Sequence, residues 1–157
     1  HEPMALMMVD IDHFKKINDR YGHPVGDKVL CSVVEVLRER VRSQDLVGRY
    51  GGEEFVVLLP DTTAKGGYLL AQQLCEAVQA LHLEHEGQPI PVTVSIGVYG
   101  GRLQPGDHWD MLISAADRAL YEAKDRGRNR VEVVEALRRP ASLVTANSGS
   151  ETQPALF

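Results

Sequence analysis

Residues 46–59 read LVGRYGGEEFVVLL and hold the pattern that decides the fold. The apolar runs on either side of the Gly51-Gly52 pair predict two strands, at residues 46–50 and 54–59. The glycine pair readily supplies the positive φ angles that a tight hairpin turn needs. The stretch therefore predicts a β-hairpin whose turn exposes the two glutamates that follow the glycines.

Residues 4–9 form a short, wholly apolar run that ends at Asp10. A run of this length suits a central strand covered on both faces better than a helix. The other elements follow from the helical or strand-like spacing of apolar residues. Helices are expected at residues 14–20, 24–41, 69–81 and 112–127, a loop around Gly87 and Pro89, and strands at residues 92–99 and 130–134.

This order of strands and helices predicts an α+β fold with a ferredoxin-like arrangement, in which one mainly antiparallel sheet is flanked by helices. Residues 1–137 are expected to form the domain. Residues 138–157 are rich in Pro, Ser, Thr and Asn and show little periodicity, which predicts a disordered tail. The chain starts at His1 without an initiator Met or a signal peptide, so we expect a fragment of a longer protein.

Composition limits the classes of function. The 157 residues carry 17 Lys and Arg against 22 Asp and Glu, and the net charge of −5 argues against non-specific coating of nucleic acid or acidic membranes. No apolar run approaches the roughly 20 residues that span a bilayer. Cys31 and Cys75 lie in apolar helical stretches, so both are expected to be small core residues in a reducing compartment.

Four carboxylates flank the predicted strand ends. Asp10 and Asp12 follow the buried strand, and Glu53 and Glu54 follow the glycine pair. If these ends are neighbours, the carboxylates would repel one another unless a cation lay among them, and oxygen ligands suit Mg²⁺ or Mn²⁺. The alternative is that Asp12 caps the following helix and the glutamates face water.

Residues 49–55, RYGGEEF, resemble the signature of the GGDEF family of diguanylate cyclases in its GGEEF form. The resemblance covers residues 4–134 and implies a nucleotidyl-cyclase palm that condenses two GTP molecules into cyclic di-GMP and releases pyrophosphate. It is carried further by DIDHFKKIND at residues 10–19, YGH at 21–23, Gly26-Asp27, SIGV at 95–98, Ala116-Asp117 and GRN at 127–129.

The resemblance assigns the chemistry of the site to named positions. Asp10 and Glu53 would be side-chain metal ligands together with the Ile11 carbonyl, and two Mg²⁺ or Mn²⁺ ions would serve each half-site. Asp10, Glu53 and Glu54 would be catalytic, and Glu54 would either bind the second metal or accept the hydroxyl proton. Because each site holds one GTP, turnover would require an antiparallel homodimer.

Nucleotide recognition is assigned in the same way. Asn18 and Asp27 would read guanine, whereas outside this motif they would be ordinary turn or helix-end residues. The phosphate-binding groups would be the backbone N–H groups of Phe14 and Lys15 and the side chains of Lys124 and Arg128, of which the two cations alone would be a solvated helix end.

Arg42 and Asp45 match the Arg-x-x-Asp site of the family, which binds the product cyclic di-GMP as an inhibitor. The alternative is a surface ion pair worth well under about 1 kcal/mol. Gln72 and Gln73 stand where a further Arg commonly contributes, so weak feedback is expected. The family segment Asp-x-Leu-Thr-Gly-Leu-x-Asn-Arg does not precede Met4, so reduced activity of this fragment is also expected.

Two other functions stay open at this point. The first is a non-catalytic module that senses GTP or cyclic di-GMP, a fate usually accompanied by loss of the carboxylates at the glycine turn, which this sequence keeps. The second is a polymerase-like palm for another nucleotide, which Asn18 and Asp27 disfavour. No nucleic-acid polymer and no membrane contact are expected for this fragment. The expected location is the cytoplasm, and membrane anchoring of the parent protein stays open.

Overall fold

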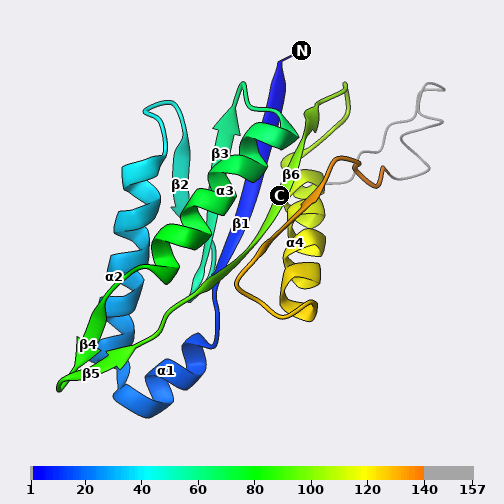
Figure 1. Cartoon of the computed structure of the whole chain (residues 1–157). Coiled ribbons are helices and arrows are strands. Elements are labelled where there is room, and N and C mark those ends of the chain that lie inside the picture. The colour runs from blue at the N-terminus through cyan, green and yellow to red at the C-terminus, as the bar shows by residue number, and fades with distance from the viewer. Residues whose placement is uncertain (1, 140–157) are drawn as a thin grey trace.

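A mixed sheet with helices on both faces forms the centre of the protein, as seen in a computed structural model that describes residues 2–139 (Figure 1). Its elements are β1 (Pro3–Ile11), α1 (Phe14–Tyr21), α2 (His23–Arg40), β2 (Leu46–Arg49), β3 (Glu54–Pro60), α3 (Ala64–Gln79), β4 (Leu83–His85), β5 (Gln88–Ile90), β6 (Val94–Arg102), α4 (Trp109–Asp125) and β7 (Val131–Val134). The strand order is β2-β3-β1-β6-β7, and only β6 and β7 are parallel. The predicted α+β fold with a mainly antiparallel sheet is confirmed.

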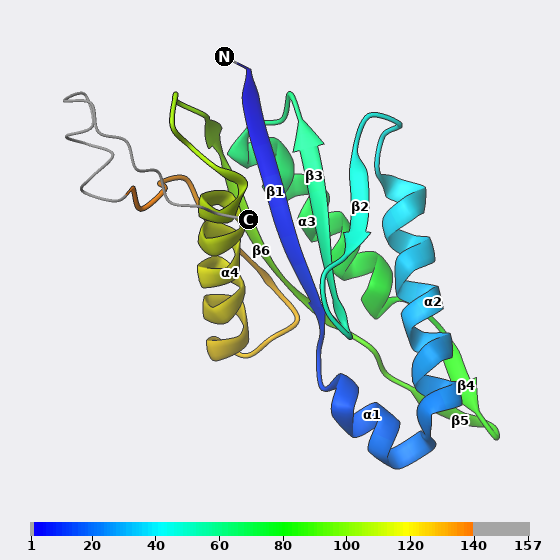
Figure 2. The same cartoon turned by 180° about the vertical axis from the view of Figure 1, so that it is seen from behind.

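Strand β1 runs through the middle of the sheet, and its side chains alternate between two cores. Ala5, Met7 and Val9 pack with α2 and α3, whereas Leu6 and Met8 pack with α4 on the opposite face (Figures 1 and 2). All of them are at most 2% exposed. Because a slip of one residue would exchange the two faces, this burial fixes the register of β1 against its neighbours.

Helix α4 lies directly on β6, and Gly97 makes the close approach possible. A Cβ atom at Gly97 would collide with backbone atoms of Ala116 and Leu120. The helix presents small buried side chains, including Ala115 and Ala119, to the sheet. The C-terminal end of α4 lies at the same end of the sheet as the C-terminal end of β1 (Figures 1 and 2).

Helices α1 and α2 form a corner beyond the end of β1 (Figure 1). α1 buries Phe14 and Ile17, as its apolar spacing predicts. Gly22, between the two helices, has a φ of 95°, a conformation that favours glycine. Pro24 lies in the first turn of α2, where its missing N–H leaves no helical hydrogen bond unmade. The corner therefore follows from local sequence.

The prediction of a simple loop around Gly87 and Pro89 is wrong. β4 and β5 pair as a separate two-stranded antiparallel sheet. Glu86 and Gly87, between them, both have positive φ angles, which two-residue hairpin turns of the common kind require. This hairpin is too short and too exposed to give a clear alternation of apolar and polar residues.

The two cysteines differ, which corrects the prediction that both are core residues. Cys75 is buried, and burial raises the pKa of its thiol to about 12. Cys31 is exposed and lines a hollow between α2 and β2. It stands next to the buried stripe of α2, which includes Leu30 and Val33, and an apolar sequence neighbourhood alone does not reveal that offset.

The predicted tail, residues 138–157, lies outside the described residues from residue 140 onward. Arg139 is described, and its Nε donates to Oδ1 of Asp107 at 2.8 Å. Leu137 is buried in the core on the α4 side, with Tyr99. Within residues 2–139, no helix combines the length and the apolar character needed to cross a membrane.

Candidate active site

The β2–β3 loop and the C-terminal end of β1 meet at one end of the sheet (Figure 2). Asp10 pairs with Glu54 in the antiparallel register of β1 and β3. The backbone N–H of Ile11 donates to the Glu53 carbonyl at 3.3 Å. The sheet thus brings together all four residues to which sequence analysis assigned metal binding and catalysis.

Asp10 is the most deeply buried carboxylate of this group, with 4% exposure. Its Oδ2 atom contacts Nζ of Lys124, near the end of α4. Its Oδ1 atom is also buried and has no hydrogen-bond partner among the described residues. Burial raises the pKa of Asp10, and the hydrogen bond and charge of Lys124 oppose that rise. A buried carboxylate oxygen without a donor is costly, so this atom suits a cation as its partner.

Glu54 lies beside Asp10 and shares its electrostatic environment. Its side chain is half-buried, and the pKa of its carboxyl is raised by burial and then by the negative charge of Asp10, whereas Lys124 opposes the rise. Glu53 is half-buried as well. A cation at this end of the sheet would relieve the repulsion between the carboxylates.

The donor set fits a hard divalent metal only if backbone oxygen contributes. In the described part of the chain, no three His, Cys, Asp or Glu side chains are grouped so that they could hold a metal by themselves. Asp10 and Glu53 with the Ile11 carbonyl supply two carboxylates and one carbonyl, a set of the kind that Mg²⁺ and Mn²⁺ accept alongside water and phosphate oxygens. The unpartnered Oδ1 of Asp10 supports this fit.

Asp12 corrects both readings of the Asp-x-Asp pair. It does not cap α1, because His13 is the N-cap residue and no side chain bonds to that helix end. Its charge helps to raise the pKa of Asp10, but its own oxygens are already taken by donors of the protein. Its two oxygens accept hydrogen bonds from Thr93 Oγ1 and Ser95 Oγ, both at 2.7 Å, and from the Asn129 N–H at 3.0 Å.

The prediction that Gly51 and Gly52 supply positive φ angles to the hairpin turn is wrong. Neither Gly51 nor Gly52 has a positive φ. The loop is closed by the N–H groups of Tyr50 and Gly51, which donate to the Glu54 carbonyl at 2.8 and 3.3 Å. A Cβ atom at Gly52 would meet nothing within 4 Å. The space beside Gly52 is therefore open to a ligand or a second chain.

Phosphate-binding candidates surround the end of β1. Phe14 and Lys15 begin α1, and its first helical hydrogen bond runs from Ile17 N to His13 O, so the first two amides have no helical acceptor. The Lys15 side chain is exposed and pairs with Asp19 at 3.3 Å. The candidate phosphate-binding group of Lys15 is therefore its backbone N–H.

The two predicted phosphate-binding cations differ in their surroundings. Lys124 is half-buried against Asp10. Arg128 is exposed, and it lies beyond the end of α4 in a loop where its φ is 64°. Arg128 is close enough to Asp10 for its charge to act on that carboxylate.

The predicted guanine readers lie together at the corner of α1 and α2. Asn18 is half-buried on α1, and its Oδ1 has no hydrogen-bond partner among residues 2–139. Gly26 faces it so closely that a Cβ atom there would collide with Oδ1. Asp27 follows Gly26 and is exposed. An amide with an unused acceptor thus lies against the residue that precedes the exposed Asp27 carboxylate.

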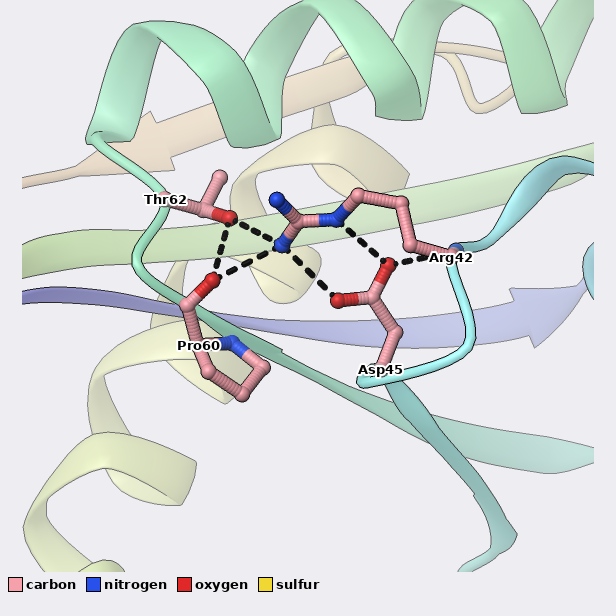
Figure 3. Close-up of polar contacts among 4 residues, drawn as sticks. All are labelled: Arg42, Asp45, Pro60 and Thr62. Atoms are coloured by element: carbon pink, nitrogen blue, oxygen red, sulfur yellow. Dashed lines mark hydrogen bonds and ion pairs between the residues drawn. The ribbon is translucent and has the colours of Figure 1, made fainter.

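Arg42 and Asp45 form a braced ion pair in the turn between α2 and β2 (Figure 3). Arg42 Nη2 donates to Asp45 Oδ1 at 2.9 Å, to the Pro60 carbonyl at 2.7 Å and to Thr62 Oγ1 at 2.8 Å. The Asp45 side chain is fully buried, whereas that of Arg42 is 45% exposed. The pair is more than a surface contact because it ties this turn to the β3–α3 turn. Gln72, on α3, is exposed and donates to the Tyr68 hydroxyl.

Comparison with known proteins gives the family of the chain. Residues 1–130 match the family described as "Diguanylate cyclase, GGDEF domain". The chain belongs to the GGDEF family. The GGEEF form is seen in the sequence of this GGDEF domain, at residues 51–55.

This GGDEF domain is similar to both characterised sequences and solved structures. It is 43% identical over 130 residues to diguanylate cyclase DgcP of Pseudomonas aeruginosa, a match that covers 83% of this chain and 19% of that protein. It resembles the active GGEEF domain of a diguanylate cyclase from Vibrio cholerae, with a TM-score of 0.78, 32% identity and coverage of 86% and 85%. It also resembles the GGDEF domain of DgcB from Caulobacter crescentus in complex with c-di-GMP, with a TM-score of 0.78, 33% identity and coverage of 83% and 77%.

The chain spans only 19% to 35% of the length of the first curated relatives that it matches. The likeness therefore concerns only that part of those proteins. Family membership defines the fold and the expected class of enzyme, a nucleotidyltransferase.

Sequence reasoning missed the role of Asp12 in this GGDEF domain. A sequence signal was present, because Thr93 and Ser95 alternate along a predicted strand and place two hydroxyl groups on one face. What could not be read from spacing is that β6 pairs with β1 so that Ser95 lies opposite Asp10. That pairing brings both hydroxyls to Asp12.

Proposed function

We propose that this GGDEF domain is a diguanylate cyclase that condenses two GTP molecules into cyclic di-GMP. In each of two steps a 3′-hydroxyl attacks the α-phosphate of the other nucleotide, a phosphodiester bond forms, and pyrophosphate leaves with the electrons of the broken bond. The observation that carries the proposal is the buried Oδ1 of Asp10, which has no donor among residues 2–139, on a residue that pairs with Glu54 across the sheet and contacts Lys124 through its other oxygen.

Asp10 and Glu53, with the Ile11 carbonyl, would hold Mg²⁺ or Mn²⁺, and two ions are proposed for each half-site. Bound there, the ions would lower the pKa of the attacking 3′-hydroxyl and offset charge on the α-phosphate and the leaving pyrophosphate. The fit is supported by the shared position of these residues at the end of β1, where the Ile11 N–H meets the Glu53 carbonyl.

Glu54 is proposed to act at the same centre as a proton acceptor or a ligand. Its carboxyl is half-buried at the end of the sheet, where Glu54 pairs with Asp10, and either role needs only a carboxylate within reach of the hydroxyl group or the metal. Lys124, Arg128 and the first amides of α1 are proposed to hold the triphosphate and to orient its α-phosphate.

Guanine is the proposed base because of the groups at the α1–α2 corner. The Asp27 carboxylate can accept from N1–H and the 2-amino group, an edge that adenine does not offer. Asn18 contributes an amide whose Oδ1 has no hydrogen-bond partner among residues 2–139. The substrate is therefore proposed to be GTP and not ATP.

Each site is proposed to bind one GTP, so bond formation requires two sites to face each other in an antiparallel homodimer. The open space beside Gly52 supports this arrangement, because no atom of the described residues comes within 4 Å of a Cβ placed there. Glycine commonly stands where another backbone or a ligand approaches closely. A single chain is expected to bind GTP without cyclising it.

Arg42 and Asp45 are proposed to form a product-inhibition site for cyclic di-GMP. They line a hollow of about 440 Å³ that also includes Thr63 and Gly66. Gln72 and Gln73 stand in place of a further cation, so feedback is proposed to be weak. Residues 1–137 are proposed as the catalytic domain, acting in the cytoplasm.

The test is to incubate the full chain at several concentrations with GTP and Mg²⁺ and to separate the products. Cyclic di-GMP that rises faster than linearly with protein is expected, because turnover requires a dimer. Glu53→Gln should abolish product, whereas Glu84→Gln, an exposed change on β4, should not. GTP binding without product, even after forced dimerisation, would instead indicate a non-catalytic sensor.

A further inference from the structure

Asp12 is a buried carboxylate at the edge of the site, with 5% exposure, and the proposed chemistry gives it no part. Its side chain joins three segments that are far apart in the sequence. They are the end of β1, the start of β6 through Thr93 and Ser95, and the loop after α4 through the Asn129 N–H. The Asp12 N–H also donates to the Thr93 carbonyl at 2.9 Å.

The loop after α4 has a backbone that needs support. Arg128 and Asn129 have φ angles of 64° and 49°, so two consecutive residues other than glycine lie in the left-handed region. Such conformations are unfavourable for L-residues and persist where surrounding contacts hold them. The Arg128 N–H donates to the Ala123 carbonyl at 2.9 Å, and the Asn129 N–H donates to Asp12.

We infer that Asp12 is a positioning residue, which fixes the Arg128 side chain toward the triphosphate of bound GTP by holding the Asn129 amide. The inference rests on the proposed function, in which Arg128 binds phosphate. Asp12 also directly follows β1, which carries Asp10, so one side chain ties the carboxylate end of that strand to the loop that carries Arg128.

The chemistry of the three donors explains why this position is an aspartate. Two hydroxyl groups and one amide N–H converge on its two oxygens, and an ionised carboxylate can accept from all of them. Asparagine has nearly the same shape, but its single acceptor oxygen is neutral, so the hydrogen bond from the Asn129 N–H loses its ionised acceptor and one hydroxyl group must turn round to accept from the NH₂ group. Asp12→Asn therefore loosens the loop without leaving a cavity.

The first measurement compares two ligands of the full chain, GMP and the GTP analogue with a methylene bridge between the β- and γ-phosphates. Asp12→Asn should weaken the analogue about tenfold and leave GMP affinity unchanged within twofold, because GMP lacks the β- and γ-phosphates of the triphosphate that Arg128 is proposed to hold. An equal loss for both ligands would overturn the inference in favour of a purely structural role.

The second measurement is a double-mutant cycle with Arg128→Ala. If Asp12 acts through Arg128, the effect of Asp12→Asn on analogue affinity should disappear when Arg128 is already absent. Additive losses would contradict the inference. Failure of the unmodified chain to bind the analogue would overturn the proposed function, and the inference with it, whereas binding that Asp12→Asn leaves intact would overturn the inference alone.

Milder variants and a matched control separate positioning from folding. Thr93→Val and Ser95→Ala each remove one donor and keep the carboxylate, so each should weaken the analogue a few-fold with GMP unaffected, even if Asp12→Asn fails to fold. Asp107 is a buried carboxylate remote from the site, with a side chain 1% exposed. Asp107→Asn should leave both affinities unchanged, and a loss of analogue binding equal to that of Asp12→Asn would contradict the specific role of Asp12.

Discussion

Lys124 Nζ contacts Oδ2 of Asp10, so a cation assigned to phosphate binding rests on a carboxylate assigned to metal binding. The contact compensates a charge that is only 4% exposed. A divalent metal that approaches Asp10 must compete with this ammonium group, whereas a bound triphosphate would offer Lys124 another partner. Metal and nucleotide should therefore bind cooperatively.

Lys124→Met tests that competition. Without nucleotide, the variant should bind Mn²⁺ about tenfold more tightly than the unmodified chain, which corresponds to roughly 1.4 kcal/mol of lost competition. Its affinity for GTP should fall, because a phosphate partner is gone. A titration in which electron paramagnetic resonance detects free Mn²⁺ measures the metal affinity directly. Lys65→Met, an exposed change on α3, is the control for lost positive charge. Equal Mn²⁺ affinity of the Lys124 variant and the unmodified chain would show that Lys124 does not compete.

Gly26→Ala should impair the choice of base. The added methyl group would collide with Oδ1 of Asn18 and displace that amide from the guanine edge. Loss of one such hydrogen bond costs about 1–3 kcal/mol, or roughly 5- to 150-fold in GTP affinity, and selectivity over ATP should fall with it. Competition binding with both nucleotides measures this. In the control, Gly48→Ala, the new methyl meets only Val56 at an ordinary 3.5 Å, so the same loss there would refute the steric explanation.

The sequence was sufficient to predict the elements whose apolar residues are buried. β1 has a continuous apolar run because both its faces are covered, and α1 buries the Phe14 and Ile17 that its spacing singled out. The β4–β5 hairpin escaped prediction because its stability comes from turn residues with positive φ and not from apolar alternation. Cys31 escaped because being one residue from a buried position on a helix changes the face.

The sequence motif was sufficient to predict which residues form the candidate site, but not which side chains from distant elements contact one another there. Asp10, Glu53 and Glu54 meet as expected because β1 and β3 pair in register. The contact between Lys124 and Asp10 depends on how closely α4 approaches β6, which the sequence indicates only through Gly97. Tertiary packing of this kind cannot be derived from the spacing of residues along the chain.

Arg42→Ala should reduce both stability and cyclic di-GMP binding. The change leaves the buried Asp45 carboxylate without its guanidinium and unties the α2–β2 turn from Pro60 and Thr62. Loss of a hydrogen bond to a charged group costs about 1.5–3 kcal/mol, which urea unfolding resolves. Arg38→Ala, an exposed change on α2 that lies outside this hollow, is the matched control and should leave both properties unchanged. Cyclic di-GMP binding that survives Arg42→Ala, measured by calorimetry, would refute the proposed inhibition site.

Asp107→Asn should destabilise the protein in a way that depends on pH. The hydrogen bonds from Arg139 hold the pKa of Asp107 below its ordinary value of 3.8, with further help from the Gln104 N–H. A carboxylate with a lowered pKa stabilises the folded state above the pKa of the unfolded state, and that contribution is lost as the pH falls through the folded pKa. The difference in free energy of unfolding between the two proteins should therefore be constant near neutral pH and should shrink below pH 3.8.

Arg139→Ala removes the other half of the same pair and should reproduce this behaviour, with a loss of about 1.5–3 kcal/mol near neutral pH. Denaturant unfolding at a series of pH values compares the two variants with the unmodified chain. The Arg139 side chain is only 29% exposed, so solvent screens the pair less than it screens a free surface ion pair.

If Arg139 contributes in this way, a chain that ends at Leu137 should lose the same free energy. The folded domain then extends at least two residues past the boundary expected from composition. Equal stability of chains that end at residues 137 and 139 would instead show that the boundary lies at Leu137.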